Sequence, residues 1–272
     1  MSDLPPPVPV CPAVNPLVRP FAELVHALRF LTRLPVPFSR TITPPPLNQT
    51  MRMFSVAGAG IGLMIAVVLL AGKQLQLPVM LAAVLAVAAG MVVTGALHED
   101  GLADTADGLG GGKTRERRLD IMRDSRIGSY GTLALIVAVG ARVSCYATLL
   151  PLAPVALMLV VAACQSFSRA LMVDLLWATP PARSEGASAY AGQPSQSVAL
   201  TAILIGLMLT LVAGYFTSFE NAILALALGL GVTAGVRWLA LRLIGGQTGD
   251  ICGAVQVTSE VMMLSAFVAT LR

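Results

Sequence analysis

The chain has 272 residues, of which 56% are hydrophobic and only 12% are charged. An average soluble domain has about 25% charged residues, so this composition excludes an ordinary water-soluble globule. Long aliphatic runs with only 5% aromatic residues also argue against an outer-membrane barrel. The net charge of +4 reflects basic residues in loops that favour the cytoplasmic side, and we expect no nucleic-acid binding. The composition therefore predicts an all-α, polytopic transmembrane helical bundle.

Two proline-rich stretches, at 5–7 and 44–46, flank residues 21–33 near the N-terminus. The segment FAELVHALRFLTR between them predicts an amphipathic helix that lies at the membrane interface. Residues 1–18 form a proline-rich leader without a basic region followed by an apolar one, so we expect no cleaved signal peptide.

Crossing the hydrocarbon layer takes about 20 apolar residues in a helix. Seven segments meet or approach this length: 54–72, 78–97, 130–150, 155–176, 198–217, 222–243 and 251–271. We therefore expect about seven spans within a single integral-membrane domain over residues 1–272.

The basic residues are distributed unevenly between the loops. Five precede the first span and six lie between the second and third spans, whereas the loop between the first two spans holds only Lys73. The positive-inside rule then places the N-terminus and residues 98–129 in the cytoplasm. The same alternation puts residues 177–197 and 244–250 on that side, so three polar segments are expected to meet there.

Five ionisable residues lie inside the apolar runs: Arg142, Arg169, Asp174, Arg237 and Glu260. Such residues usually face the interior of a bundle, where they pair or take part in function. Ion pairs of Arg169 with Asp174, or of Arg237 with Glu260, would explain them.

The polar segment between the second and third spans carries the strongest chemical signal. Asp100, Asp104 and Asp107 follow at the spacing i, i+4, i+7, which places three carboxylates on one face of a helix. Such a cluster repels itself unless a cation binds it, and hard oxygen ligands favour Mg²⁺ or Mn²⁺ over zinc. Mg²⁺ commonly takes one or two carboxylates together with substrate phosphates, so we expect metal-dependent pyrophosphate chemistry here. A solvated acidic segment is the simpler alternative, but Ala and Gly fill the positions between the acids.

Further polar residues lie close to this cluster in the sequence. Arg123 and Arg126 flank Asp124, and guanidinium groups bind phosphate, although both could also serve only to orient the following span. His98 is a candidate general base toward a hydroxyl nucleophile. On an ideal helix, however, His98 points away from the carboxylate face.

Two glycine-rich stretches have different interpretations, one as a hinge and one as part of the site. GLGGGKT at 108–114 resembles a phosphate-binding P-loop, but Asp107 occupies the position of the first glycine and no strand precedes it, so we interpret it as a hinge. GGQTGD at 245–250 opens the last span, and there Thr248 and Asp250 could hold a phosphate or its metal.

Three motifs together resemble the cobalamin synthase (adenosylcobinamide-GDP ribazoletransferase) family. They are LHEDGLADTADGLGGGKTRERRLDIMRDSRIGSYG at 97–131, FLTRLPVP at 30–37 and GGQTGDICGA at 245–254. Their order and the distances between them match those of the family along nearly the whole chain. One departure lies outside them, where FSVAG at 54–58 replaces the FPLVG that is frequent in the family.

The resemblance implies a multi-pass enzyme of the bacterial inner membrane with a cytoplasmic active site and Mg²⁺ as cofactor. Such an enzyme joins adenosylcobinamide-GDP to α-ribazole or its 5′-phosphate, releases GMP, and completes the nucleotide loop of vitamin B12. Besides these substrates, the implied partner is the lipid bilayer, and a homo-oligomer is left open.

The resemblance also implies roles for individual residues. The metal on the pyrophosphate would be held by Asp100, Asp104 and Asp107. The transferred phosphate and the departing GMP would be steadied by Arg123 and Arg126. The proton of the attacking hydroxyl would pass to Asp124, to an aspartate of the cluster, or to His98. The site would be completed by Thr32, Arg33, Thr248 and Asp250.

Two other classes of protein remain as alternatives. CDP-alcohol phosphotransferases also use helical aspartates with Mg²⁺, but their DG-x-x-AR motif requires an arginine where this chain has Asp104. A secondary transporter would show an inverted repeat and acidic residues at mid-membrane, whereas the acids here concentrate in one segment.

Overall fold

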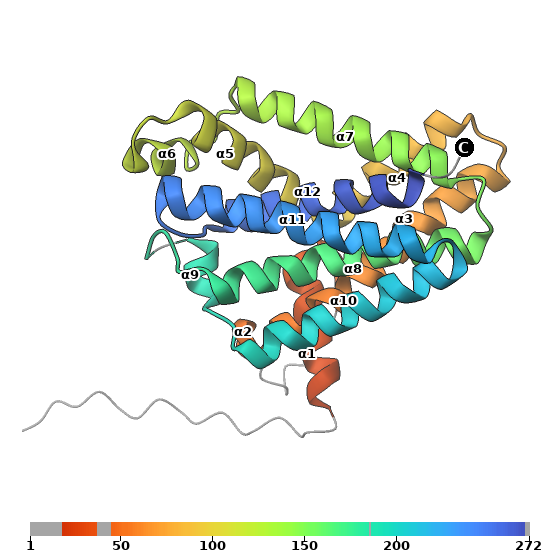
Figure 1. The fold of residues 1–272 in the computed structure, drawn as a ribbon, viewed down its shortest axis with the longest axis horizontal. Coiled ribbons are helices and arrows are strands. Elements are labelled where there is room, and N and C mark those ends of the chain that lie inside the picture. Colours follow the sequence, from red (N-terminus) through yellow and green to blue (C-terminus); the bar gives the residue numbers. More distant parts are fainter. Residues whose placement is uncertain (1–17, 37–44, 185, 270–272) are drawn as a thin grey trace, which may run out of the picture.

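The computed structural model describes residues 18–36, 45–184 and 186–269, and within them it consists of helices joined by short connections (Figure 1). The predicted leader lies outside the described residues apart from Val18. The helices are α1 Arg19–Leu31, α2 Leu47–Thr50, the 3₁₀ helix η1 Met51–Met53, α3 Phe54–Gln74, α4 Val79–Thr94, α5 Leu97–Gly111, α6 Arg115–Ile121, α7 Ser129–Leu149, α8 Pro154–Ala178, α9 Ala187–Ala191, α10 Gln196–Phe216, α11 Phe219–Ile244 and α12 Gly249–Val268.

Six stretches are long and apolar enough to cross a membrane: Leu47–Gln74, Ser129–Leu149, Pro154–Ala178, Gln196–Phe216, Phe219–Ile244 and Gly249–Val268. A seventh is obtained if the bent pair α4 and α5 counts as one broken span. The prediction of a multi-pass helical bundle with about seven spans is therefore confirmed.

One predicted span differs from the structure. The second apolar run was expected to continue as a helix to residue 97, but α4 ends at Thr94 and α5 turns away from it by 92°. Gly95 and Ala96 form the break, and both have positive φ angles, of 65° and 54°. A glycine adopts this conformation freely, whereas Ala96 is held in it by its surroundings.

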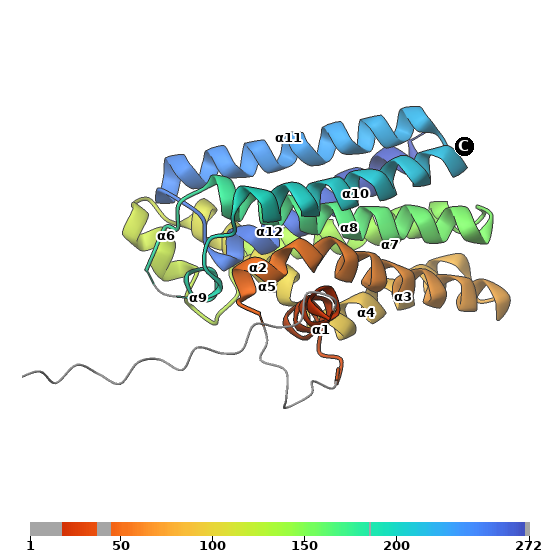
Figure 2. The same ribbon diagram turned by 90° about the horizontal axis from the view of Figure 1, so that it is seen from below.

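The core of the bundle is α8, the most buried of the spans, with α3, α10 and α12 packed around it (Figure 2). Glycines allow the closest approaches. A Cβ atom on Gly62 of α3 would lie 2.6 Å from the Ala162 Cα atom, and one on Gly206 of α10 would lie 2.9 Å from the Phe167 Cα atom. Small residues at helix contacts are typical of membrane bundles, where close backbone packing replaces the hydrophobic effect.

The predicted amphipathic helix is present as α1, which runs across the direction of the long helices and packs against α3 (Figures 1 and 2). Its inner face includes the buried carboxylate of Glu23, which accepts hydrogen bonds from Arg19 and Arg52. Its outer face exposes Phe21. The helix itself is confirmed, and its place at the membrane interface remains a prediction.

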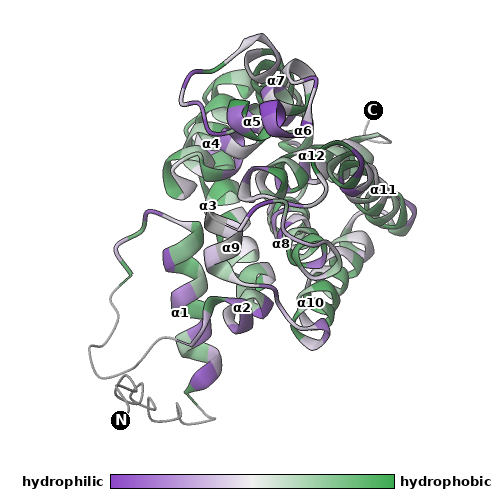
Figure 3. Ribbon diagram, turned by 90° about the vertical axis from the view of Figure 1, so that its left-hand side faces the viewer, coloured by the Kyte–Doolittle hydropathy of each residue, from purple (hydrophilic) through white to green (hydrophobic). Residues whose placement is uncertain are grey.

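Polar residues gather on a few elements. In Figure 3, hydrophilic residues colour α5 and α6 at the end that faces the viewer, and they also colour α1, whereas the long helices are mainly hydrophobic. Figure 1 shows that α1 lies nearer the middle of the long axis, where α5 begins.

Candidate active site

The acidic helix and the C-terminal motif are in direct contact. A Cβ atom on Gly101 of α5 would lie 2.9 Å from the Asp250 carbonyl oxygen and 3.2 Å from the Gly253 Cα atom. One on Gly253 of α12 would lie 2.9 Å from the His98 carbonyl oxygen. The two helices thus touch backbone to backbone, which brings segments about 150 positions apart in the printed sequence into one site.

Carboxylates from both helices converge at this contact. Asp104 is half-buried, and its carboxylate is repelled by those of Asp100, Asp250 and Asp107. Arg183, in the segment after α8, attracts the same group. The structure therefore joins Asp250 to the predicted cluster and adds a guanidinium group that the sequence analysis missed.

Asp250 is held by two donors. Its Oδ2 atom accepts hydrogen bonds from Thr248 Oγ1 at 3.1 Å and from an Arg183 Nη2 atom at 3.2 Å. Thr248 is fully buried, and its hydroxyl also accepts a hydrogen bond from the Ile251 N–H group, which caps α12. Thr248 thus fixes the start of α12 and the orientation of Asp250 together.

A short backbone pairing places Arg183 beside this carboxylate. The Gln247 N–H group donates to the Pro180 carbonyl oxygen, and the Ala182 N–H group donates to the Gln247 carbonyl oxygen, both at 2.8 Å. The segment after α8 is thereby joined to the loop before α12. Nothing in the sequence around Arg183 resembles a motif, so only this pairing identifies it.

Asp107 points toward the start of α7. Its Oδ2 atom accepts a hydrogen bond from the Gly128 N–H group at 2.7 Å, and its Oδ1 atom accepts one from the Gly131 N–H group at 2.9 Å. These are unpaired N–H groups of a helix N-terminus, which a carboxylate satisfies well. Asp107 therefore anchors α7 on α5 with both of its oxygens.

Thr32 and Arg33 support the break between α4 and α5. The Thr32 hydroxyl donates to the Leu28 carbonyl oxygen at 2.6 Å and so ends α1. The Arg33 N–H group donates to the Val93 carbonyl oxygen at 2.7 Å, and the Arg33 side chain lies against Gly95. Among the described residues, neither Thr32 nor Arg33 shows a hydrogen bond or ion pair with the carboxylates.

Arg123, Asp124 and Arg126 lie in the connection between α6 and α7. Both arginines are exposed, and Arg126 donates to the Asp124 carboxylate from its Nε and Nη2 atoms. These hydrogen bonds lower the pKa of Asp124 to about 2. Asp124 is therefore charged at neutral pH and is a weak proton acceptor.

His98 is buried, and its Nε2 atom has no hydrogen-bond partner among the described residues. It lies in the first turn of α5 and borders two cavities, one toward the interior of the bundle and one toward Asp100. The prediction that His98 belongs to the site remains untested, but its position beside Asp100 is compatible with it.

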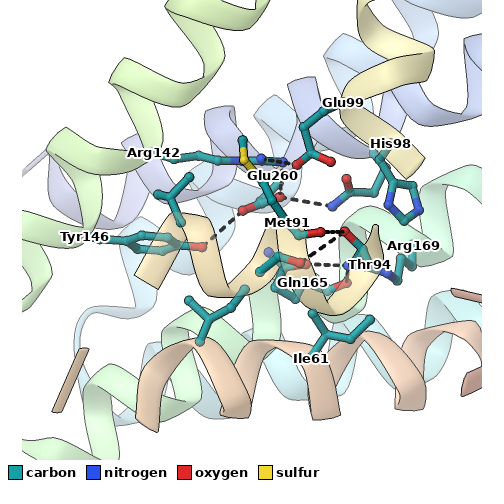
Figure 4. Close-up of a pocket in the computed structure, with 14 residues that line it drawn as sticks. Ile61, Met91, Thr94, His98, Glu99, Arg142, Tyr146, Gln165, Arg169 and Glu260 are labelled. Carbon is teal, nitrogen blue, oxygen red and sulfur yellow. Dashed lines mark hydrogen bonds and ion pairs between the residues drawn. The ribbon is translucent and has the colours of Figure 1, made fainter. Parts of the chain in front are cut away.

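A buried ionic network lies next to the first turn of α5, in the interior of the bundle (Figure 4). Arg142 of α7 donates to Glu99 at 2.5 Å and to Glu260 of α12 at 2.7 Å. Tyr146 donates to the second oxygen of Glu260, while Arg169 of α8 lies within electrostatic range of both carboxylates. Two arginines and two glutamates thus balance in charge around a cavity of about 20 Å³, enough for a single water molecule.

The ion pairs expected from the sequence are wrong. Arg237 pairs with Asp174 rather than with Glu260, and Arg169 has no ion pair among the described residues but donates to the Gln165 side chain. Glu99 was not among the residues predicted from the sequence. It is adjacent to Asp100, but adjacent residues on a helix point in different directions, and Glu99 pairs with Arg142 in the interior.

One cavity of about 110 Å³ is bordered by residues of all three motifs. The motif at 30–37 contributes Phe30, the motif at 97–131 contributes His98 and Asp100, and the motif at 245–254 contributes Gly249 and Asp250. The three motifs, which are far apart in the sequence, therefore border a common cavity.

Comparison with known proteins identifies the family of the chain. Residues 23–268 match the family described as cobalamin-5-phosphate synthase. Curated relatives named adenosylcobinamide-GDP ribazoletransferase include a protein of Xanthobacter autotrophicus, 48% identical over 89% of this chain and 94% of its own length. A relative of the same name from Azorhizobium caulinodans is 46% identical over 90% of this chain and 95% of its own length. No solved structure matches the chain. By the match of its sequence to the family and to these relatives, the chain belongs to the cobalamin-5-phosphate synthase family.

Proposed function

We propose that this chain is an adenosylcobinamide-GDP ribazoletransferase, an enzyme that transfers a phosphorus group between two soluble substrates at a membrane. The proposal rests on the shared name of its relatives and on one observation of the structure. That observation is the contact of α5 with α12, which brings Asp100, Asp104, Asp250 and Arg183 close together.

In the proposed reaction, a hydroxyl oxygen of α-ribazole or its 5′-phosphate attacks the phosphorus that is attached to cobinamide. A new P–O bond forms, the P–O bond to the bridging oxygen of the pyrophosphate breaks, and GMP leaves. The hydroxyl proton passes to a base. Because Asp124 holds its proton so weakly, we propose Asp100, Asp104 or His98 for this role.

The donor set fits Mg²⁺ when a pyrophosphate is bound. The repulsion among Asp100, Asp104 and Asp250 favours a cation between them. Among the described residues, no group of three His, Cys, Asp or Glu side chains is close enough to hold a metal alone. Mg²⁺ characteristically takes one or two carboxylates and completes its shell with phosphate oxygens and water. When bound, it would neutralise charge on the pyrophosphate.

This arrangement refines the metal-binding set implied by the resemblance. We propose that Asp100 and Asp104 hold the cation and that Asp250 completes its site. Asp107 is proposed to act by anchoring α7, since both of its oxygens accept backbone hydrogen bonds. Thr248 orients Asp250.

Three arginines are candidates for binding the anionic substrates. Arg183 contacts Asp250 directly, and Arg123 and Arg126 are exposed in the connection that leads into α7. We propose that Arg183 binds a phosphate of the donor and that Arg123 and Arg126 attract the anionic substrates. Thr32 and Arg33 are proposed to support the site through the break at Gly95.

The bilayer is the bacterial inner membrane in this proposal, with the N-terminus and the site in the cytoplasm. The loops rich in Lys and Arg support this orientation.

The test is GMP release by purified, detergent-solubilised protein given adenosylcobinamide-GDP and α-ribazole, with and without Mg²⁺. We expect GMP and the cobalamin product to form one for one, only with the metal. Folded protein that forms neither product would overturn the proposal. A parallel arm with CDP-activated lipid donors then tests the CDP-alcohol phosphotransferase alternative.

A further inference from the structure

The cavity beside the carboxylates has two kinds of wall. Its polar wall consists of His98, Asp100, Ser188 and Asp250. Its apolar wall, which is larger, includes Phe30, Met51, Phe54, Met172 and Ala191. We refer to this cavity as the apolar chamber. It adjoins the proposed reaction site along its polar wall.

The apolar wall is suited to a flat ring. Phe30 and Phe54 stack with their ring centroids 5.7 Å apart, which gives a rigid aromatic surface. Met51 and Met172 are unbranched side chains that adapt to the shape of a ligand. The volume of about 110 Å³ is of the same order as the ~150 Å³ of an apolar protein cavity that takes up benzene.

Resting on the proposed function, we infer that the apolar chamber holds the base of the ribazole acceptor. α-Ribazole is a riboside of dimethylbenzimidazole, a flat bicyclic base with two methyl groups and no hydrogen-bond donor. With the base between the phenylalanine and methionine side chains, the ribose extends toward Asp100 and Asp250. Its hydroxyl groups then face the place proposed for the pyrophosphate.

The other ring systems of the reaction fit this chamber poorly. Guanine and the adenine of the adenosyl group carry donors and acceptors around their edges, and the apolar wall would leave several of them without partners, which is costly. A corrinoid ring is far larger than a cavity of about 110 Å³. Among the rings present in the two substrates, only the dimethylbenzimidazole base is both small and apolar.

One polar atom complements this base. Apart from its glycosidic nitrogen, the base has a single ring nitrogen that accepts a hydrogen bond. His98 borders the chamber, is only 2% exposed, and has an Nε2 atom without a partner among the described residues. A hydrogen bond from this atom to the ring nitrogen would satisfy both groups. His98 is therefore assigned to acceptor binding, and the role of the base then falls to Asp100 or Asp104.

The first experiment fills the chamber with a larger side chain. Ala191→Phe adds a ring to its wall, whereas the matched control Ala134→Phe adds the same ring at the groove between α7 and α12. With adenosylcobinamide-GDP saturating, we expect Ala191→Phe to raise the KM for α-ribazole at least tenfold. The KM for adenosylcobinamide-GDP should stay within twofold, and Ala134→Phe should change neither value.

The second experiment varies the base and the cavity together. Wild-type protein should show a KM roughly tenfold higher for the benzimidazole riboside that lacks both methyl groups, because two buried methyl groups are lost. Met172→Ala enlarges the chamber and should reduce this ratio to below threefold. If Ala191→Phe does not fold, this pair of measurements decides the assignment.

The outcomes separate the two proposals. Wild-type protein that forms no GMP would overturn the proposed function itself. Active wild-type protein with no preference for the methylated riboside, or an Ala191→Phe variant with an unchanged KM for α-ribazole, would overturn only the assignment of the chamber. If Ala191→Phe raises only the KM for adenosylcobinamide-GDP, the chamber binds the donor instead. If it changes neither KM, a lipid acyl chain is the remaining occupant.

Discussion

Gly101 of α5 and Gly253 of α12 lie so close that a Cβ atom on either would be within 3.2 Å of the Cα atom of the other. The neighbouring atoms are backbone atoms, which cannot turn aside as a flexible side chain would. This contact sets the distance between Asp100, which precedes Gly101 directly, and Asp250, which lies three residues before Gly253. The geometry of the proposed reaction site therefore depends on two residues that have no chemistry of their own.

We expect Gly101→Ala and Gly253→Ala each to push the two helices apart. Overpacking of this kind costs about 1–3 kcal/mol of stability, and the displaced carboxylates should lower kcat/KM at least tenfold. The matched control is Gly140→Ala in α7, where a Cβ atom would meet nothing within 4 Å. Thermal unfolding and GMP release in the same detergent measure both effects. Activity equal to that of the control would contradict this account of the contact.

The buried network makes a separate prediction about stability. Arg142→Leu leaves Glu99 and Glu260 without their shared guanidinium group in the interior of the bundle. Removing one partner of a buried ion pair costs about 3–5 kcal/mol, so the unfolding temperature should fall markedly. Arg142→Lys keeps the charge and should recover part of the loss. An Arg142→Leu variant that unfolds at the wild-type temperature would show that the network does not stabilise the bundle.

The interaction of Asp124 with Arg126 leads to a prediction about the pH profile of kcat. Its hydrogen bonds with Arg126 lower its pKa from 3.8 to about 2, so their contribution is complete above about pH 4 and is lost as the pH falls through 2. Between pH 5 and pH 9 this carboxylate does not titrate. We therefore expect Asp124→Asn to leave the shape of the pH profile of kcat unchanged in that range. Loss of an acidic limb from the profile would instead identify Asp124 as the general base.

Much of the architecture could be predicted from the sequence because its causes are local. Apolar runs of about 20 residues mark spans wherever they occur, and the spacing of Asp100 and Asp104 places them on one side of a helix in any context. The pairing of Arg142 with Glu260 could not be predicted in this way. It depends on how α7 and α12 are rotated against each other, and a single sequence does not record that rotation.

The break in the second predicted span has the same kind of cause. Gly95 alone is compatible with a continuous helix, and Ala96 favours one. The turn forms because the Arg33 backbone and side chain occupy the space beside Val93 and Gly95, and these contacts come from a segment about 60 positions earlier in the sequence. A tertiary contact therefore overrides the local preference for a helix at this point.

Asp107 and Asp100 should respond differently to the same substitution. Asp100→Asn removes a proposed metal-binding charge, so turnover should fall at least a hundredfold at any Mg²⁺ concentration while the unfolding temperature stays at the wild-type value. Asp107→Asn weakens the hydrogen bonds to Gly128 and Gly131, which should cost about 1–3 kcal/mol of stability. The Mg²⁺ concentration that gives half-maximal activity should not change. A shift in that concentration without loss of stability would return Asp107 to the set of residues that bind the metal.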